Sequence, residues 1–188
     1  MIWSKMKQLL EGYLCPELKD RVEYSNTSYR YLPDKAGTCH ITVDKKNILN
    51  MADASSTIKW YKTEQEIKSD PDIQVHIGAE ELEAVRKAVG EAVPEERLLV
   101  IAQNRKISEL AKELLLAQAT LCKSNFQEVA NKFLSASVEE CLESSQILLN
   151  ILALLDRRVG KKRLLNMSEK IKQKHPIVRY FYELRLKV

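Results

Sequence analysis

The sequence predicts an α+β protein, with a small sheet near the N-terminus and helices through most of the remaining chain. Two observations favour this class. Between residues 21 and 44, tyrosine, threonine and valine are frequent, and apolar residues alternate with polar ones as in a half-buried strand. From residue 79 onward, apolar residues instead recur every three or four positions, as on one face of a helix.

The first expected element is a helix that ends before Pro16. Cys15 precedes this proline, and a residue before proline is disfavoured in the helical conformation. The apolar residues of this segment recur at helical spacing: Trp3, Met6, Leu10, Tyr13 and Leu14.

Three strands should follow as an antiparallel meander, over residues 21–32, 38–44 and 48–51. Residues 33–37 form the expected first turn, since proline presets one backbone dihedral and glycine accepts a positive one. Three strands cannot enclose a core, so a helix must cover one face of the sheet. The N-terminal helix is one candidate for this cover.

A helix over residues 54–67 is the other candidate, with Asp53 as its N-cap. Its expected inward positions are Ile58, Tyr61 and Ile67. We also expect the tyrosines of this half to pack beneath the covering helices. The alternative is that Tyr29 and Tyr31 stack nucleic-acid bases on the sheet face.

A subdomain boundary is expected near Gly78. Residues 73–77 alternate enough for one more short strand, whereas no convincing strand follows this glycine. Residues 1–78 would then form a small α+β subdomain, and residues 79–188 a bundle of about six helices. Paired acids and capping boxes mark helix starts in this bundle, at residues 80–81, 95–96, 124–127 and 137–140.

The chain carries the marks of a cytoplasmic protein. Its longest apolar run, at residues 147–155, contains Asn150 and falls far short of the ~20 apolar residues of a membrane span. Its N-terminal residues lack the apolar core and cleavage site of a signal peptide. The four cysteines are far apart, which favours free thiols in a reducing compartment. We expect no membrane association.

No catalytic, cofactor or metal signature is apparent in the sequence. The five glycines are scattered, so no phosphate-binding loop is present. His40, His76 and His175 are solitary, and Cys39 and His40 point to opposite faces because they are strand neighbours. We therefore expect no catalytic residue, no cofactor and no metal, although fold class alone does not exclude an enzyme.

The most distinctive feature is a basic C-terminal segment. Residues 156–188 carry 11 Lys/Arg and 3 Asp/Glu, a net charge of +8, whereas residues 79–155 carry 8 and 12, a net charge of −4. These cations could contact nucleic-acid phosphates, or acidic residues of the same chain could neutralise them. The candidate patch consists of Arg157, Arg158, Lys161, Lys162 and Arg163.

Several stretches resemble a family of uncharacterised bacterial proteins of about this length. They are residues 3–5, residues 28–37 followed by 41–44, and residues 155–164. The resemblance extends over nearly the whole chain. It implies a bacterial cytoplasmic protein of unknown function and assigns no catalytic residue.

These observations favour a non-enzymatic role in which the protein binds another protein, or itself, or serves a structural purpose. Nucleic-acid binding through residues 157–163 is the alternative. An enzyme with an unrecognised site is the second alternative.

Overall fold

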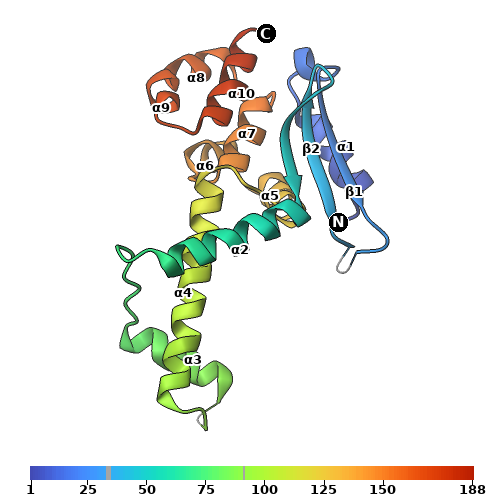
Figure 1. Cartoon of the computed structure of the whole chain (residues 1–188). Coiled ribbons are helices and arrows are strands. Elements are labelled where there is room, and N and C mark those ends of the chain that lie inside the picture. Colours follow the sequence, from blue (N-terminus) through green and yellow to red (C-terminus); the bar gives the residue numbers. More distant parts are fainter. Residues whose placement is uncertain (33–34, 91) are drawn as a thin grey trace. The chain divides into compact units, whose positions relative to one another are not determined.

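The computed structural model describes residues 1–32, 35–90 and 92–188 (Figure 1). It has an N-terminal helix, a three-stranded antiparallel sheet and then mostly helices, so the predicted α+β class is confirmed. The chain divides into two compact units. We call Met1–Ser56 with Leu116–Val188 the sheet unit, and Thr57–Leu115 the helical unit.

This division differs from the predicted one, because Gly78 lies inside the helical unit rather than at a boundary. The sheet unit is built from two separate stretches of sequence. The chain passes between the units within two helices, α2 (Asp53–Ser69) and α4 (Glu95–Ala117), so no loop or composition change marks either crossing.

The sheet has the order β1-β2-β3, with both pairs antiparallel. The strands are β1 (Val22–Ser28), β2 (Gly37–Val43) and β3 (Lys46–Ala52). β1 ends four residues earlier than the predicted strand. Of the predicted turn at 33–37, residues 33 and 34 lie outside the described residues.

Helices cover one face of the sheet. Cys39, Ile41 and Val43 of β2 are buried on that face, while the residues between them are half-exposed. Helix α1 (Trp3–Tyr13) packs on β1, as one of the two predicted covers, and α5 (Lys123–Ser135) packs on β2 and β3 (Figure 1). The second cover therefore comes from far along the chain.

Six helices of the described chain complete the sheet unit. Their centre is α7 (Ile147–Leu155), in which eight of nine residues are buried, as predicted for this apolar run. Its one polar residue, Asn150, donates from Nδ2 to the carbonyl oxygens of Cys141 and Ser144, at 2.8 and 3.0 Å, which offsets part of the cost of burying an amide. Its Oδ1 is buried without a hydrogen-bond partner among the described residues. The six helices are α5, α6 (Val138–Glu143), α7 (Ile147–Leu155), α8 (Lys161–Asn166), α9 (Ser168–Lys172) and α10 (Pro176–Leu186).

Most of the predicted helix starts are confirmed. Ser137 caps α6 together with Glu140, and the acids at 80–81 and 95–96 lie in first turns. The expected box at 124–127 is wrong: α5 begins at Lys123, and the Asn125 side chain accepts from the Cys122 N–H at 3.1 Å. Asn125, the third residue of α5, thus takes the capping role that was predicted for Gln127.

The helical unit consists mainly of α2, α3 (Ala79–Val89) and α4. Helix α4 uses two faces. Leu98 and Ala102 form a cluster with Val85 of α3, and nine residues later Ile107 and Ala111 form another with Ile67 of α2. Nine residues correspond to a rotation of about 180°, so the two clusters lie on opposite sides of α4.

Two predictions for this unit are wrong. Residues 73–77 form no strand in the described chain, which offers them no partner strand to pair with. Ile58 and Tyr61 are not inward positions, since they are 70% and 64% exposed, whereas Ile67 is buried as predicted. Ile58 lies nine residues from Ile67, so a helix places them on opposite faces.

The tyrosines of the N-terminal half also divide. Tyr24 is buried, and its ring lies 6.2 Å from that of Phe126. Tyr29 and Tyr31 are exposed, because they follow the end of β1 instead of lying on a covered face. The expectation of packed tyrosines therefore holds for Tyr24 and is wrong for Tyr29 and Tyr31.

Candidate functional site

The basic segment is organised around a buried carboxylate. Asp156 is 1% exposed at the end of α7. Its Oδ2 accepts two hydrogen bonds from Arg158, from Nε at 2.8 Å and from Nη2 at 2.6 Å. The guanidinium also lies 4.3 Å from the centre of the Tyr13 ring. Arg158 therefore has a structural role, since its charge satisfies Asp156 and its plane stacks on α1.

Arg163 is also paired within the chain. Its Nη2 donates to Glu139 Oε1 at 2.6 Å, and Lys170 similarly reaches Glu143 at 2.8 Å. The pKa of Glu139 is lowered, mainly because its carboxylate accepts a hydrogen bond from its own backbone N–H and, to a smaller extent, because it accepts one from Arg163. Glu139 and Glu143 of α6 thus neutralise part of the basic segment. This agrees with the expectation that acidic residues of the same chain could neutralise its cations.

The other three cations of the candidate patch remain exposed: Arg157, Lys161 and Lys162. Across residues 1–32, 35–90 and 92–188, none of them forms an ion pair. The Arg157 N–H donates to the Tyr13 carbonyl at 2.8 Å, which fixes the backbone beneath its side chain. The structure therefore keeps the five predicted residues together and leaves three of them available for an external anion.

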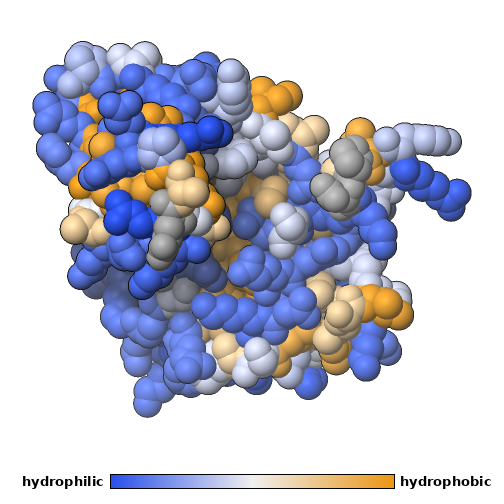
Figure 2. Space-filling model, turned by 90° about the horizontal axis from the view of Figure 1, so that it is seen from below, coloured by the Kyte–Doolittle hydropathy of each residue, from blue (hydrophilic) through white to orange (hydrophobic). Residues whose placement is uncertain are grey.

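The helical unit buries few of its apolar side chains. Helix α2 has one buried residue among 17, and α4 has five among 23. A helix that packs along its whole length would bury a continuous stripe. Exposed apolar residues of this unit include Ile58, Trp60, Tyr61, Leu99, Val100 and Leu114. Figure 2 shows hydrophobic residues at the surface among charged ones on one face of the molecule.

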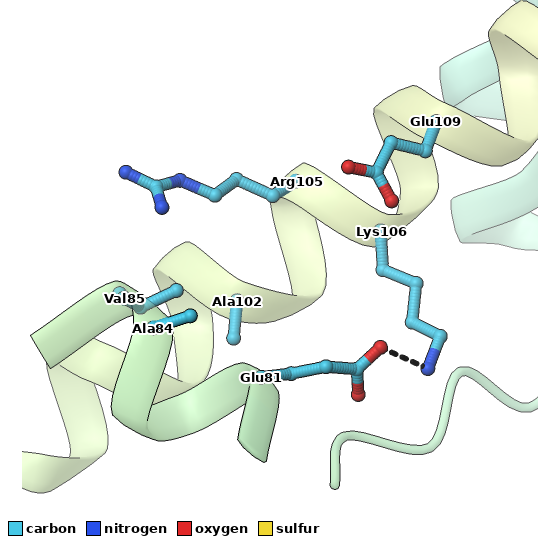
Figure 3. A pocket seen from close by; sticks show the side chains of 7 residues that line it. All are labelled: Glu81, Ala84, Val85, Ala102, Arg105, Lys106 and Glu109. Carbon is cyan, nitrogen blue, oxygen red and sulfur yellow. Dashed lines mark hydrogen bonds and ion pairs between the residues drawn. The ribbon is translucent and has the colours of Figure 1, made fainter. Parts of the chain in front are cut away.

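A shallow pocket of about 160 Å³ lies between α3 and α4 (Figure 3). The side chains of Glu81 and Lys106 meet across it at 2.6 Å, whereas Arg105 extends away from them. Lys106 also donates to the His76 carbonyl, and its bond to Glu81 lowers the pKa of that carboxyl. Glu81 and Lys106 thus satisfy each other, which leaves Arg105 and Glu109 as the other charged residues of the pocket lining.

The structure also reveals a buried lysine that the sequence did not single out. Lys123, the first residue of α5, is only 6% exposed. Its Nζ lies 2.6 Å from Ser28 Oγ, at the end of β1, and also donates to the Lys35 carbonyl. Ser28 and Lys123 are 95 residues apart and belong to no shared motif, so spacing could not have linked them.

Asp53 fixes the backbone around this lysine. Its two carboxylate oxygens accept from the N–H groups of Lys123, at 2.9 Å, and of Gly37, at 2.8 Å. The first residues of β2, α2 and α5 are thereby tied together beside Ser28. Burial raises the pKa of the neighbouring Cys39 thiol to about 12, which makes this cysteine a core residue without nucleophilic character.

Two general classes of site are absent from the described part of the chain. No group of three or more His, Cys, Asp and Glu residues there is arranged to hold a metal ion. None of the helices described is both long enough and apolar enough to cross a membrane.

The fold and these sites define an α+β protein in which a helical unit is inserted into a discontinuous sheet unit. The chain belongs to the SF0329 protein family, whose model matches residues 2–186. The match extends over nearly the whole chain, as the sequence resemblance implied. Comparisons with curated proteins and with solved structures find no match.

Proposed function

We propose that this protein acts by binding another protein through the outward face of α2. The observation that carries the proposal is the exposure of Ile58 and Tyr61 opposite the buried Ile67. Residues three apart on a helix are neighbours, so Ile58 and Tyr61 form one apolar surface. Covering an isoleucine or an aromatic side chain contributes about 1.5–3 kcal/mol, enough for both residues to act as anchors of an interface.

The charge of the helical unit suggests the chemistry of the partner. Residues 57–115 carry 9 Lys/Arg and 12 Asp/Glu, a net charge of −3, whereas the remaining residues carry a net charge of +7. Complementary charge steers association and disfavours wrong partners. The net charge thus favours a partner of opposite net charge. The border of the patch itself is of mixed sign, because Lys62 lies one turn from Ile58 and Glu64 one turn from Tyr61, so the apolar patch of the partner should be bordered by both acidic and basic residues.

The proposed setting is the bacterial cytoplasm. The sequence resemblance supports a bacterial origin. The four cysteines are free thiols, three of them buried, as suits a reducing compartment. The role proposed for this binding face is itself non-enzymatic, in accord with the pairing of Glu81 and Lys106 in the pocket between α3 and α4.

Site-specific photo-crosslinking in cells tests the proposal. A photoreactive benzoylphenylalanine replaces Tyr61, and the matched control carries it at Asn50, an exposed position of β3. We expect one protein to crosslink at position 61 and not at position 50, and I58E to abolish that product. The same pattern of products at both positions, or no product at position 61, would refute this binding face. A product formed only with this chain itself would identify self-association instead.

Nucleic-acid binding is the second candidate. It is favoured by one observation, the exposure of three cations: Arg157, in the connection after α7, and Lys161 and Lys162, the first two residues of α8. Against it, Arg158 and Arg163 are already paired with Asp156 and Glu139. The remaining patch would make at most about three phosphate contacts, which predicts weak binding that depends on salt.

A further inference from the structure

The contact between Ser28 and Lys123 has the geometry of an activated serine. The lysine is almost fully buried, and the serine is exposed at the end of β1, where a substrate can reach it. The 2.6 Å separation of Nζ and Oγ is a short hydrogen bond, within reach of direct proton transfer. A nucleophile beside a base that is itself held in place is the general arrangement of covalent catalysis.

The remaining contacts of Lys123 suit the role of a base. In the structure, Nζ donates to both Ser28 Oγ and the Lys35 carbonyl. When the amine is neutral, its lone pair can take the Ser28 proton while an N–H keeps the bond to the Lys35 carbonyl. Described ionisable groups near the pair include Asp53 of α2, which accepts from the Lys123 N–H, and Cys39 of β2, which senses the charges of both Lys123 and Asp53.

We propose that Ser28 and Lys123 form a serine–lysine pair that transfers acyl groups from esters or amides. The Ser28 oxygen bonds to the carbonyl carbon as its proton passes to Lys123. The tetrahedral intermediate collapses when the bond to the leaving alcohol or amine breaks, and that group takes the proton from Lys123. Water then attacks the acyl-serine and gives a proton to Lys123, which returns it to Ser28 as the acid leaves.

Hydrogen bonds around the pair fix the backbone on which Ser28 and Lys123 lie. Asp53 anchors the backbone of Lys123, and through the Gly37 N–H it anchors the strand that pairs with Ser28. The pair lies wholly within the sheet unit, so this activity does not depend on protein binding by the helical unit. The alternative is a purely structural role, in which Lys123 only connects the end of β1 to α5. The two roles differ in that only the catalytic one requires Lys123 to accept a proton.

A fluorophosphonate probe tests the proposal on the full-length protein. Its phosphorus would bond to Ser28 Oγ, fluoride would leave, and the serine proton would pass to Lys123. We expect one adduct in the intact mass, located at Ser28 by peptide mapping. S28A should lose the adduct, and S25A, which removes another exposed serine of β1, should keep it.

The decisive variant is K123R. Arginine can donate the same hydrogen bonds but cannot be deprotonated, so it preserves a tie and removes the base. We expect the labelling rate at Ser28 to fall by about 100-fold or more, as for loss of a general base. An unchanged rate in folded K123R would overturn the proposal, as would a wild-type protein that forms no adduct at Ser28. If K123R does not fold, the labelling rate of Ser28 in the wild type is compared between native buffer and denaturing urea. Equal rates in the two conditions would also overturn the proposal.

Discussion

Asp156 and Arg158 form a hydrogen-bonded ion pair at the exit of α7, with the carboxylate fully buried and the guanidinium 40% exposed. The Arg158 backbone N–H also donates to Asp156 Oδ1 at 2.8 Å, so the backbone and the side chain of Arg158 both bind this carboxylate. Its guanidinium stacks on Tyr13, while the Arg157 N–H donates to the Tyr13 carbonyl. The start of the basic segment is thereby fixed to Tyr13 of α1 by two contacts.

Replacement of Asp156 by alanine should therefore destabilise the protein by about 2–3 kcal/mol, the usual cost of lost hydrogen bonds to a charged group. The cost should not exceed this range greatly, because Arg158 can still reach water. The free energy of unfolding in urea measures the effect. As a control, E169Q removes an exposed pair with Lys172 and should change that free energy by less than about 0.5 kcal/mol. Equal effects of D156A and E169Q would contradict the structural role of Asp156.

The nucleic-acid alternative predicts that R157A/K161A/K162A weakens binding to duplex DNA or RNA in low salt. It should also reduce the slope of log K against log salt by about 1–3, since each lost phosphate contact contributes about 0.9 for duplex DNA. A fluorescence-anisotropy titration at several salt concentrations measures both quantities.

The matched control for that measurement is K19A/K45A/K46A, which removes the same charge from three other exposed positions. It should leave the slope nearly unchanged. If the two triple variants behave alike, net charge rather than the patch governs binding. If the wild type does not bind at low salt, the nucleic-acid alternative is wrong.

Stability should also depend on pH through the acids of α6. Lys170 lowers the pKa of Glu143, and bonds to the backbone and hydroxyl of Ser137 lower that of Glu140, from an ordinary value of 4.5. A carboxyl whose pKa is lowered on folding stabilises the folded state above its unfolded pKa. This contribution is lost as pH falls through the folded value, so the urea midpoint should decline from about pH 4.5 downward.

The variant E140Q/E143Q checks this assignment. Its urea midpoint should vary less than that of the wild type below pH 4.5, and the two proteins should differ most near neutral pH. A wild-type decline that is unchanged in the double variant would assign the acid sensitivity to other carboxylates, such as Asp44, which pairs with Arg21 and also has a lowered pKa.

Local patterns were sufficient to predict much of the fold. Alternation at Cys39, Ile41 and Val43 identified the covered face of β2, and Ser137 with Glu140 identified the start of α6. The unit boundaries could not be predicted in this way. They fall inside α2 and α4, where helical periodicity continues without a break.

For the candidate sites too, local sequence pattern predicted some features and not others. The basic run at 157–163 is contiguous in sequence and was therefore visible, but its partners were not. Glu139 lies 24 residues from Arg163, and only the packing of α6 beside the segment brings the two together. Ser28 and Lys123 come from distant elements and are ordinary in their local context, so only the three-dimensional structure brings them together.

Two glycines of the sheet unit should respond oppositely to alanine. A Cβ at Gly37 would lie 1.9 Å from the Thr27 carbonyl oxygen, so G37A must push β1 and β2 apart and should destabilise the protein by about 1–3 kcal/mol. A Cβ at Gly12, within α1, meets nothing within 4 Å, and G12A should stabilise the protein by about 0.5–1 kcal/mol. Urea unfolding of both variants measures the two changes. Since Gly37 also binds the carboxylate that anchors Lys123, G37A should slow fluorophosphonate labelling at Ser28, whereas G12A should not. Tolerance of G37A would contradict the close approach of the two strands at Gly37, and destabilisation by G12A would contradict the open surroundings of Gly12 in α1.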